Sequence, residues 1–424
     1  MDVLVSGRNV VSGSEVVVPS SKSHSIRAIF IAGLAKGVSR IKNLLFSADV
    51  MSAIDVIRKF GAVVDLNKDC VVVHGVGGQV RAPREVVDVG NSGTTLRFAM
   101  MVAAIADGVT ALTGDEQIKK RPVKELVKFI VNLGGRVEFW EEEDHAPMIV
   151  HGGISGGESL LDALTSQYLS SALISCPLLD RDTKISLVRL NERPYVDMTM
   201  WWLNKQGIKY INNLPSDITI LGGQNYKGFD ESIVGDYSSA TFFVVLAAIS
   251  GKSIVLKNLS ADDVQGDKRV LDVVEEFGAR VDWKDKQVCV TGGNLKGQVV
   301  DMNDIPDALP ALAVLGCFAK GETKLVNVEQ ARYKETDRIH VMCEELSKLG
   351  AKVRELEDGL IIEKSDLHGG SVYGHRDHRV VMALSVLGAC IEDDVVVEDV
   401  ECVNVTFPGF FTKLCHTGVK VFRR

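Results

Sequence analysis

The sequence predicts a mixed α/β protein built from six units of similar size, grouped into two lobes. The first observation behind this prediction is a pattern that recurs about every 70 residues: an amphipathic segment, a glycine, and a run of strand-forming residues. Each glycine stands where a helix would end in a left-handed conformation. The six copies fall at Gly61, Gly134, Gly207, Gly278, Gly350 and Gly418.

A second series keeps the same spacing and consists of an alanine-rich helix, a turn and an alternating strand. Units of about 70 residues are too long for the repeats of a solenoid, so we expect globular lobes. The chain of 424 residues also exceeds the usual ~100–200 residues of one domain. We therefore expect two lobes of three units with a ligand site between them. The copies lie at Gly37, Gly108, Gly251 and Gly321, with weaker ones near Asp182 and Asp393.

The composition excludes several classes of protein. A hydrophobic fraction of 46% and a charged fraction of 25% are typical of a folded globular chain. The 48 basic and 56 acidic residues give a net charge of −8, which argues against nucleic acid and anionic membranes as partners. We find no membrane-spanning stretch, no secretion signal, and neither CxxC nor zinc spacing among the eight cysteines. These features predict a cytoplasmic protein with reduced thiols.

Among the candidate elements, the first is a strand that ends near Pro19, followed by a serine-rich loop and an apolar helix. The helix is expected to begin near Ser23, with Ser23 or Ser25 as its N-cap. Lys22 and Arg27 then lie near the helix N-terminus. Cations usually avoid that end, where free amides attract anions, so the pair indicates an anionic ligand. A solvated basic turn is the alternative.

The second candidate is a glycine-containing turn, 91–95, before a helix that carries Arg97. Gly93 lets backbone amides approach a ligand closely, although an ordinary capped turn explains the same residues. The third is a basic run, Lys119–Arg121, ahead of Pro122 at a helix start. A solvated charged face is the alternative for this run.

Two later helices begin with polar residues. Thr165, Ser166 and Gln167 open an apolar helix, either as part of a binding site or as an ordinary helix cap. Asp307 stands at the start of an almost wholly apolar helix. It is therefore a candidate N-cap or a carboxylate at the edge of a site.

The motif KETDR combines two cations with carboxylates. Lys334 and Arg338 are four residues apart, which predicts a shared helix face, and Glu335 is turned by about 100° from Lys334. Such a face can bind an anion and move a proton, whereas an exposed, salt-bridged helix is the alternative.

The motif DHR, at 377–379, precedes another apolar helix. His375 and His378 suggest metal ligands, but the flanking Arg376 and Arg379 would repel a cation, so we expect no metal. The polar clusters recur at the starts of apolar helices about 70 residues apart, which predicts that they converge on one cationic cleft. The cations expected there are Lys22, Arg27, Arg121, Lys334, Arg338 and Arg379.

The chain also resembles a known family. PSSKSHSIR, GNSGTTLRF, KKRP, SQYLSSAL, GDYSSATFF, IPDALP, KETDR, DHR and TFPGFF occur in the order found in EPSP synthases, across essentially the whole chain. The resemblance implies a two-lobed inside-out α/β barrel with three repeats in each lobe. It implies a continuous lobe, 20–233, a discontinuous lobe, 1–19 with 234–424, and an active site between them.

The resemblance further implies transfer of the enolpyruvyl (1-carboxyvinyl) group of phosphoenolpyruvate to the 5-hydroxyl of 3-phosphoshikimate, in the shikimate pathway of aromatic amino-acid and chorismate biosynthesis. The hydroxyl attacks C2 while C3 is protonated, and phosphate and a C3 proton then leave. No metal, redox cofactor or covalent enzyme intermediate is implied. Both substrates carry a phosphate and a carboxylate, which accounts for several cations. We expect a monomer.

The matched motifs imply the site residues one by one. The residues expected to bind 3-phosphoshikimate are Lys22, Ser23, Arg27, Thr165, Ser166, Gln167, Asp307 and Lys334. Those expected to bind phosphoenolpyruvate are Lys22, Asn91, Gly93, Arg121, Gln167, Arg338 and Arg379. The implied catalytic residues are Lys22, Asp307 as the base at the hydroxyl, and Glu335 as the proton donor and acceptor at C3.

Three positions depart from the family pattern. Val405 replaces a lysine found in some members, Gln330 an asparagine and Glu192 a serine, so the contacts made there are not carried over. The nearest rival function is enolpyruvyl transfer to UDP-N-acetylglucosamine, but the loop before Arg121 lacks the cysteine typical of that enzyme. An RNA 3′-phosphate cyclase-like enzyme would need a basic surface, and a non-enzymatic scaffold would have no reason to place cations and carboxylates at helix starts.

Overall fold

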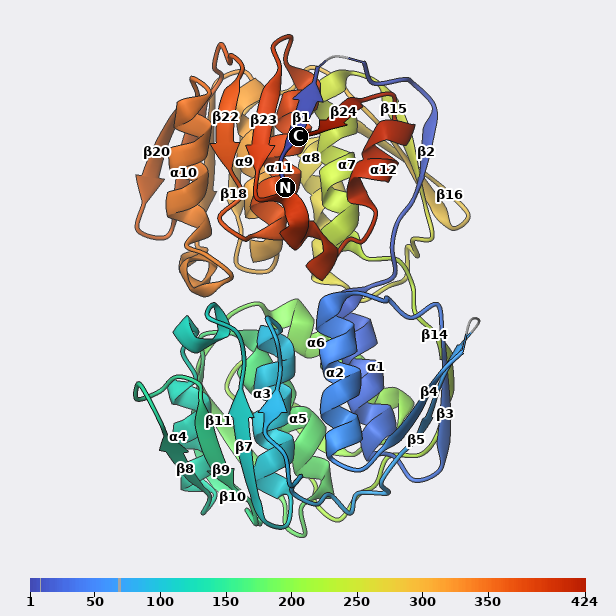
Figure 1. Ribbon diagram of the computed structural model, residues 1–424, viewed down its shortest axis with the longest axis vertical. Coiled ribbons are helices and arrows are strands. Elements are labelled where there is room, and N and C mark those ends of the chain that lie inside the picture. The colour runs from blue at the N-terminus through green and yellow to red at the C-terminus, as the bar shows by residue number, and fades with distance from the viewer. Residues whose placement is uncertain (8, 68–69) are drawn as a thin grey trace. The chain divides into compact units, whose positions relative to one another are not determined.

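The structure is a computed structural model that describes residues 1–7, 9–67 and 70–424 (Figure 1). Its contacts divide the chain into two compact units. The continuous unit comprises Lys22–Ile233, and the discontinuous unit comprises Met1–Ser21 together with Val234–Arg424. Within the described ranges, no helix combines the length and the apolar character needed to cross a membrane.

The continuous unit contains three four-stranded sheets. In spatial order, the first consists of β14 (Asp230–Ser232), β3 (Val38–Lys42), β5 (Cys70–His74) and β4 (Val63–Leu66). The second consists of β6 (Val87–Asp88), β7 (Val109–Thr113), β9 (Met148–His151) and β8 (Arg136–Phe139). The third consists of β10 (Gly157–Ala163), β11 (Thr183–Leu190), β13 (Asp217–Ile220) and β12 (Tyr210–Asn213).

The discontinuous unit also contains three four-stranded sheets, two of which include a strand from the N-terminal segment. One consists of β2 (Ser14–Val17), β15 (Ser253–Lys257), β17 (Gln287–Thr291) and β16 (Arg280–Lys284). The next consists of β18 (Val299–Asp301), β19 (Glu322–Val326), β21 (Gly359–Glu363) and β20 (Lys352–Leu356). The last consists of β22 (Gly370–Tyr373), β23 (Val395–Glu398), β1 (Val3–Ser6) and β24 (Lys420–Arg423).

All six described sheets share one pairing pattern. The first strand in each spatial order is parallel to the second, and the remaining pairs are antiparallel. The register of the pair β10 and β11, for example, joins Gly157 to Thr183 and shifts by a bulge after Leu161. The predicted mixed α/β class agrees with this arrangement, while the count of six repeats itself stays a prediction.

Two kinds of helix accompany the sheets. Six helices are buried around most of their circumference and form the centre of each unit, because apolar and small residues predominate in their sequences. In the continuous unit they are α1 (Lys22–Leu34), α3 (Gly93–Ile105) and α5 (Ser166–Ser175). In the discontinuous unit they are α7 (Tyr237–Ser250), α9 (Leu309–Phe318) and α11 (His378–Cys390).

The other helices are amphipathic or short and pack with one face against each unit. They are α2 (Ala48–Lys59), α4 (Lys124–Asn132), α6 (Arg193–Lys205), α8 (Val270–Phe277), α10 (Arg338–Lys348) and α12 (Phe410–His416). Six 3-10 turns complete the described elements: η1 (Ile118–Lys120), η2 (Cys176–Leu178), η3 (Gly266–Arg269), η4 (Pro306–Ala308), η5 (Glu329–Tyr333) and η6 (Val400–Val405). The N-termini of the central helices carry most of the candidate site residues.

Candidate active site

Arg338, the first residue of α10, is surrounded by carboxylates in the discontinuous unit. Its guanidinium donates hydrogen bonds to Asp307 (2.8 Å), Glu335 (2.6 Å) and Asp377 (2.8 Å). Only 1% of its side chain is exposed. Because charge-assisted bonds from a planar guanidinium have fixed directions, this buried cation sets the positions of all three carboxylates.

Arg379 binds the second oxygen of the Asp307 carboxylate. Its Nη2 atom lies 2.7 Å from Oδ2 of Asp307, whereas Arg338 binds Oδ1. The start of α11 positions Arg379, because the N-cap Asp377 accepts a hydrogen bond from the Arg379 amide at 2.8 Å. The predicted residues Asp307, Glu335, Arg338 and Arg379 are therefore brought together in one cluster.

The charges of this cluster stabilise one another. Burial alone would raise the pKa of the Asp307 carboxyl, but Arg379, Lys334 and Arg338 outweigh burial and hold this pKa well below its ordinary range. For Arg338, burial lowers the pKa, and the charges of the neighbouring carboxylates reverse that effect and raise it. Asp307 is therefore ionised at neutral pH, as a base must be.

The predicted helical face shared by Lys334 and Arg338 is wrong. Lys334 and Glu335 lie in a bend after η5, and α10 begins only at Arg338. The physical reason is Asp337, whose carboxylate accepts a hydrogen bond from the His340 amide at 3.0 Å and caps the helix there. The bend nevertheless brings Glu335 against Arg338, so the cation and the carboxylate still meet.

Asp307 is not the N-cap of α9, contrary to one of the two roles expected for it. It lies within η4, and Ala308 occupies the N-cap position without a side-chain cap. Since Arg338 and Arg379 bind both carboxylate oxygens, the side chain of Asp307 is directed to them instead of to the helix amides. The second expected role, a carboxylate at the edge of a site, fits its side-chain exposure of 18%.

A second buried carboxylate, Glu345 on α10, supports the turn that precedes α11. It accepts hydrogen bonds from His375 Nε2 (2.6 Å), Lys348 Nζ (2.8 Å) and the Tyr373 amide (3.0 Å). In the part of the chain that the structure describes, Glu344, Glu345 and His375 form the one group whose ligand atoms lie within metal-binding distance, 4.8 Å. The Lys348 ammonium contacts both carboxylates, at 2.9 and 2.8 Å, and so already supplies a cation there.

In the continuous unit, Lys22 is the first residue of α1 and forms an ion pair with Asp49 on α2. The Nζ–Oδ2 distance is 3.0 Å, and the two side chains are 14% and 4% exposed. Because α1 begins at Lys22, the prediction that Ser23 or Ser25 caps this helix is wrong. The Ser25 hydroxyl instead accepts a hydrogen bond from the Leu45 amide at 3.3 Å.

Arg27 is buried, at 2% exposure, between α1, α5 and α6. It donates to Thr199 Oγ1 (2.8 Å), Ser170 Oγ (3.2 Å) and the Tyr195 carbonyl (2.9 Å). It also donates to the Ser23 carbonyl at 3.1 Å. None of the described carboxylates pairs with it, and burial lowers its pKa to about 10. A buried guanidinium without an acidic partner favours a bound anion.

Gly93, the first residue of α3, lies directly beneath two guanidinium groups. A Cβ atom added to it would be 2.4 Å from Nη1 of Arg121 and 2.8 Å from Nη1 of Arg97. Arg97 donates to the carbonyls of Gly93 (3.1 Å) and Pro122 (2.9 Å), and both arginines are buried. Two cations at the positive end of a helix dipole form a strongly anion-attracting position.

Asn91 and the segment 165–167 complete the predicted residues of this unit. The Asn91 amide donates to Asp115 (2.6 Å) and Gln117 (2.5 Å), which holds the loop that leads into η1 and Arg121. Helix α5 begins as predicted, because Thr165 is its N-cap and accepts a bond from the next-but-one amide at 3.4 Å. Gln167 is half-buried in its first turn.

Several groups that hold the predicted residues in place were missed from the sequence. Asp49 pairs with Lys22, Glu345 supports the turn before α11, and Thr199 accepts from Arg27. Asp49 and Glu345 are buried acidic residues on helices with apolar faces. Since a buried carboxylate needs a partner, an acidic residue on the apolar face of a helix is the signal that would have found them.

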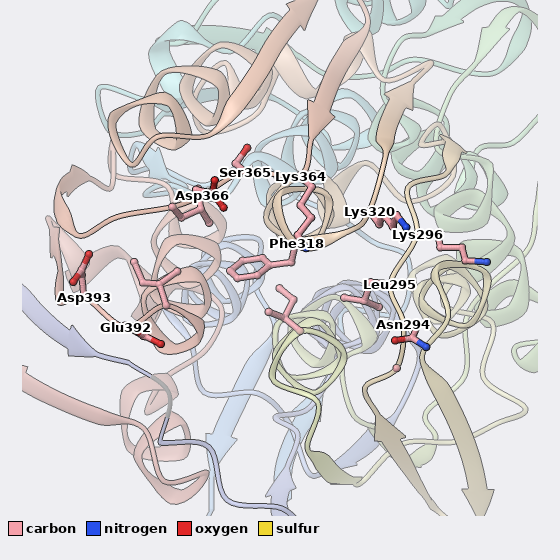
Figure 2. A pocket seen from close by; sticks show the side chains of 14 residues that line it. Asn294, Leu295, Lys296, Phe318, Lys320, Lys364, Ser365, Asp366, Glu392 and Asp393 are labelled. Carbon is pink, nitrogen blue, oxygen red and sulfur yellow. The ribbon is translucent and has the colours of Figure 1, made fainter.

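A pocket of about 910 Å³ lies elsewhere in the discontinuous unit, where α7, α9 and α11 end (Figure 2). Phe318 lies near its middle, and its walls carry Lys296, Lys320 and Lys364 as well as Asp366 (Figure 2). None of the predicted site residues lines it. The helix ends that meet there carry the negative end of the helix dipole, in contrast to the amide-rich helix starts that carry the candidate residues.

Comparison with solved structures identifies the class of the protein. The fold matches an EPSP synthase from Acinetobacter baumannii with a TM-score of 0.84, 25% identity and full coverage of both chains. It also matches the enolpyruvyl transferase NikO from Streptomyces tendae with a TM-score of 0.80 at 15% identity, over 99% of this chain and 98% of that one. The fold is that of the enolpyruvyl transferases, and the predicted two-lobed α/β class is confirmed.

Comparison of sequences identifies the family within that class. The family model for EPSP synthase (3-phosphoshikimate 1-carboxyvinyltransferase) matches residues 5–414. Proteins named 3-phosphoshikimate 1-carboxyvinyltransferase from Ruminiclostridium cellulolyticum and Acetivibrio thermocellus are each 51% identical to it, over 97% and 99% of both chains respectively. The chain therefore belongs to the EPSP synthase family, which confirms the resemblance seen in its motifs.

Proposed function

We propose that this chain transfers the enolpyruvyl group of phosphoenolpyruvate to the 5-hydroxyl of 3-phosphoshikimate and releases phosphate. The chain is a transferase of the 3-phosphoshikimate 1-carboxyvinyltransferase family, so its reaction belongs to the shikimate pathway. At the level of residues, the proposal is carried by the buried Arg338 cluster, where two carboxylates and two guanidinium groups are linked by hydrogen bonds and ion pairs.

The reaction requires two proton transfers in each of its halves. In the addition, the 5-hydroxyl oxygen bonds to C2 of phosphoenolpyruvate, its proton goes to a base, and C3 gains a proton. In the elimination, the C2–oxygen bond to phosphate breaks, the departing phosphate takes the proton held by the base, and C3 loses a proton, which restores the double bond. The atoms and electrons balance without an oxidant or reductant. The protein must therefore supply groups that hold a proton beside an oxygen and beside a carbon.

Two carboxylates suit these two positions. Asp307 is ionised and fixed between Arg338 and Arg379, which fits a base at the 5-hydroxyl. Its lowered pKa makes it a weak base by itself, but an anionic substrate beside Arg379 would offset that cation and raise the pKa. Glu335, with 10% of its side chain exposed and held by Arg338, is proposed to give a proton to C3 and take one back.

The phosphate and the carboxylate of phosphoenolpyruvate each suit the planar donors of a guanidinium group. We assign its binding to Arg121 and Gly93 at the start of α3, and to Arg338 and Arg379 in the discontinuous cluster. The crowding of Arg121 and Arg97 over Gly93 supports this assignment, because it concentrates positive charge at a helix N-terminus. The remaining residues assigned to this substrate are Lys22, Asn91 and Gln167.

The continuous unit supplies most of the groups assigned to 3-phosphoshikimate. Arg27 supports this assignment because it is buried without an acidic partner among the described residues. The N-terminus of α5 offers the amide and hydroxyl donors that a phosphate needs. The residues assigned to this substrate are Lys22, Ser23, Arg27, Thr165, Ser166, Gln167, Asp307 and Lys334. We further propose that the chain acts as a monomer in the cytoplasm, which light scattering and cell fractionation would test.

One assay tests the proposed reaction against its rival. The purified chain is incubated with phosphoenolpyruvate and either 3-phosphoshikimate or UDP-N-acetylglucosamine, and the release of inorganic phosphate is measured. Release only with 3-phosphoshikimate is the expected result. Release only with the nucleotide sugar would contradict the proposal, as would the absence of release with either acceptor. The variant Glu335→Gln provides the matched control for release that depends on this site.

A further inference from the structure

A carboxylate from the chain itself occupies the N-terminus of α5. Oε2 of Glu192 accepts hydrogen bonds from Ser166 Oγ (2.7 Å), from the Ser166 amide (3.1 Å) and from Thr165 Oγ1 (3.1 Å). Glu192 is 1% exposed and Ser166 is 2% exposed. All three donors point at one oxygen, so a single anionic atom sits at the positive end of this helix.

These donors are the ones assigned above to the phosphate of 3-phosphoshikimate. An amide N–H or a hydroxyl hydrogen donates one strong hydrogen bond at a time. A phosphate oxygen and the Glu192 carboxylate therefore cannot both be bound fully by Thr165 and Ser166. A phosphate bound to these donors would also lie beside the Glu192 carboxylate, and the two negative charges would repel each other with little water between them to screen the repulsion.

Helix capping does not explain why Glu192 lies there. Thr165 already caps α5 through its own side chain. Glu192 stands at the N-cap position of α6, yet its side chain forms no cap there and reaches α5 instead. Its backbone is also left-handed, with φ 56° and ψ 40°, which is unfavourable for a residue with a side chain. The chain thus accepts an unfavourable conformation that places a carboxylate at a helix start that has its own cap.

We propose that Glu192 is an internal competitor for the phosphate of 3-phosphoshikimate and thereby sets the affinity for this substrate. The inference rests on the proposed function and adds to it a residue that determines specificity. When the phosphate binds, the carboxylate leaves the donors of Thr165 and Ser166, and one anion replaces another without any covalent change. Glu192 should therefore lower the affinity for ligands that carry the 3-phosphate of 3-phosphoshikimate. It should not change the affinity for phosphoenolpyruvate, whose phosphate is assigned to other residues.

Two substitutions distinguish a Glu192 that competes with the phosphate from a Glu192 that only supports the structure. Glu192→Gln keeps the size and an acceptor oxygen but removes the charge, and Glu192→Ser removes the reaching group altogether. Glu158→Gln, an exposed glutamate of β10 in the same unit, is the matched control. Steady-state kinetics would give KM for each substrate, and titration calorimetry would compare 3-phosphoshikimate with shikimate, which lacks the phosphate. Circular dichroism would confirm that each variant is folded.

The expected result is a KM for 3-phosphoshikimate that is roughly tenfold lower in both Glu192 variants, since a charge-assisted contact of the competitor is worth about one order of magnitude. KM for phosphoenolpyruvate, the affinity for shikimate and the kinetics of the Glu158 control should not change. If the glutamine variant behaves like the wild type while the serine variant loses affinity, Glu192 is only a structural support and the inference is overturned.

An equal gain for shikimate and 3-phosphoshikimate would also overturn the inference, because the effect would then not depend on the phosphate. If Glu192→Ser does not fold, the glutamine variant decides alone, because its unchanged KM for 3-phosphoshikimate would overturn the inference. Failure of the proposed function looks different: the wild-type chain would then release no phosphate with 3-phosphoshikimate. Wild-type activity combined with unchanged constants in the variants would reject the role of Glu192 and leave the proposed function standing.

Discussion

Replacing Gly93 with alanine should selectively weaken the binding of phosphoenolpyruvate. The new Cβ atom would lie 2.4 Å from Nη1 of Arg121, whereas ordinary van der Waals contact begins at 3.4 Å. The guanidinium must therefore move by about 1 Å or rotate away. Arg121 is only 6% exposed, so its surroundings restrict such a movement. A displaced Arg121 guanidinium would no longer be oriented to donate at least one of its hydrogen bonds to an anionic ligand.

The size of the effect follows from that lost bond. A hydrogen bond to a charged group contributes roughly 1.5–3 kcal/mol, which corresponds to a loss of about ten- to a hundredfold in affinity. The backbone should tolerate the change, because Gly93 does not have a positive φ and alanine is favoured over glycine in helices. The variant should therefore fold normally, and its defect should appear as a higher KM for phosphoenolpyruvate with little change for 3-phosphoshikimate.

The assay compares Gly93→Ala with Gly370→Ala in the discontinuous unit. A Cβ at Gly370 would meet only the Leu349 side chain, at 3.3 Å, and that flexible group can give way. Steady-state KM values for both substrates, together with thermal unfolding, would be measured for each variant. If folded Gly93→Ala keeps the wild-type KM for phosphoenolpyruvate, the proposed contact between this substrate and Arg121 is refuted.

Three further predictions concern the Arg338 cluster. Glu335→Gln and Asp307→Asn should each lower turnover by about 10²–10⁴-fold without unfolding the protein, and Glu335→Gln should slow deuterium uptake at the methylene of phosphoenolpyruvate. A variant with normal turnover would exclude its residue from catalysis. Arg379→Lys should raise KM for phosphoenolpyruvate more than for 3-phosphoshikimate, because lysine lacks the bidentate geometry; equal losses would contradict the assignment. Folding lowers the pKa of Asp307, so the ionised carboxylate stabilises the folded protein fully above the ordinary carboxyl pKa of about 4. This stabilisation is lost as the pH falls below that value. Urea unfolding at acidic pH should therefore show a smaller loss of stability in Asp307→Asn than in the wild type.

The starts of several central helices could be predicted from the sequence because capping is local. Ser92, Thr165 and Asp377 each cap a helix that begins with the next residue, and each forms its bond with an amide only two or three residues further on. Residue type and neighbouring pattern suffice for such a prediction. The local pattern gave a wrong prediction at Lys334. Its spacing from Arg338 suggested one helix, but Asp337 caps α10, so the helix begins only at Arg338.

The contacts among the site residues could not be predicted from local pattern. Asp307 and Arg338 are brought together from different elements, and the Lys22–Asp49 pair joins two helices. Such pairs depend on the packing of the whole unit, so composition and periodicity say nothing about them. The family motifs identified most of the residues that meet, but they did not reveal that Glu192 binds the start of α5.

The pairing of β1 has a consequence for folding during synthesis. This strand lies between β23 and β24, so a segment made early in synthesis forms an interior strand of a sheet whose other members are made much later. The strand β2 likewise has no partner until β15, which follows the continuous unit in the chain, has been made. The continuous unit can complete its three sheets once Ile233 has been made, whereas the discontinuous unit also needs the later residues Val234–Arg424. The strands β1 and β2 must stay unpaired and free of aggregation until those later residues have been made, which favours the short, four-residue lengths that both strands have.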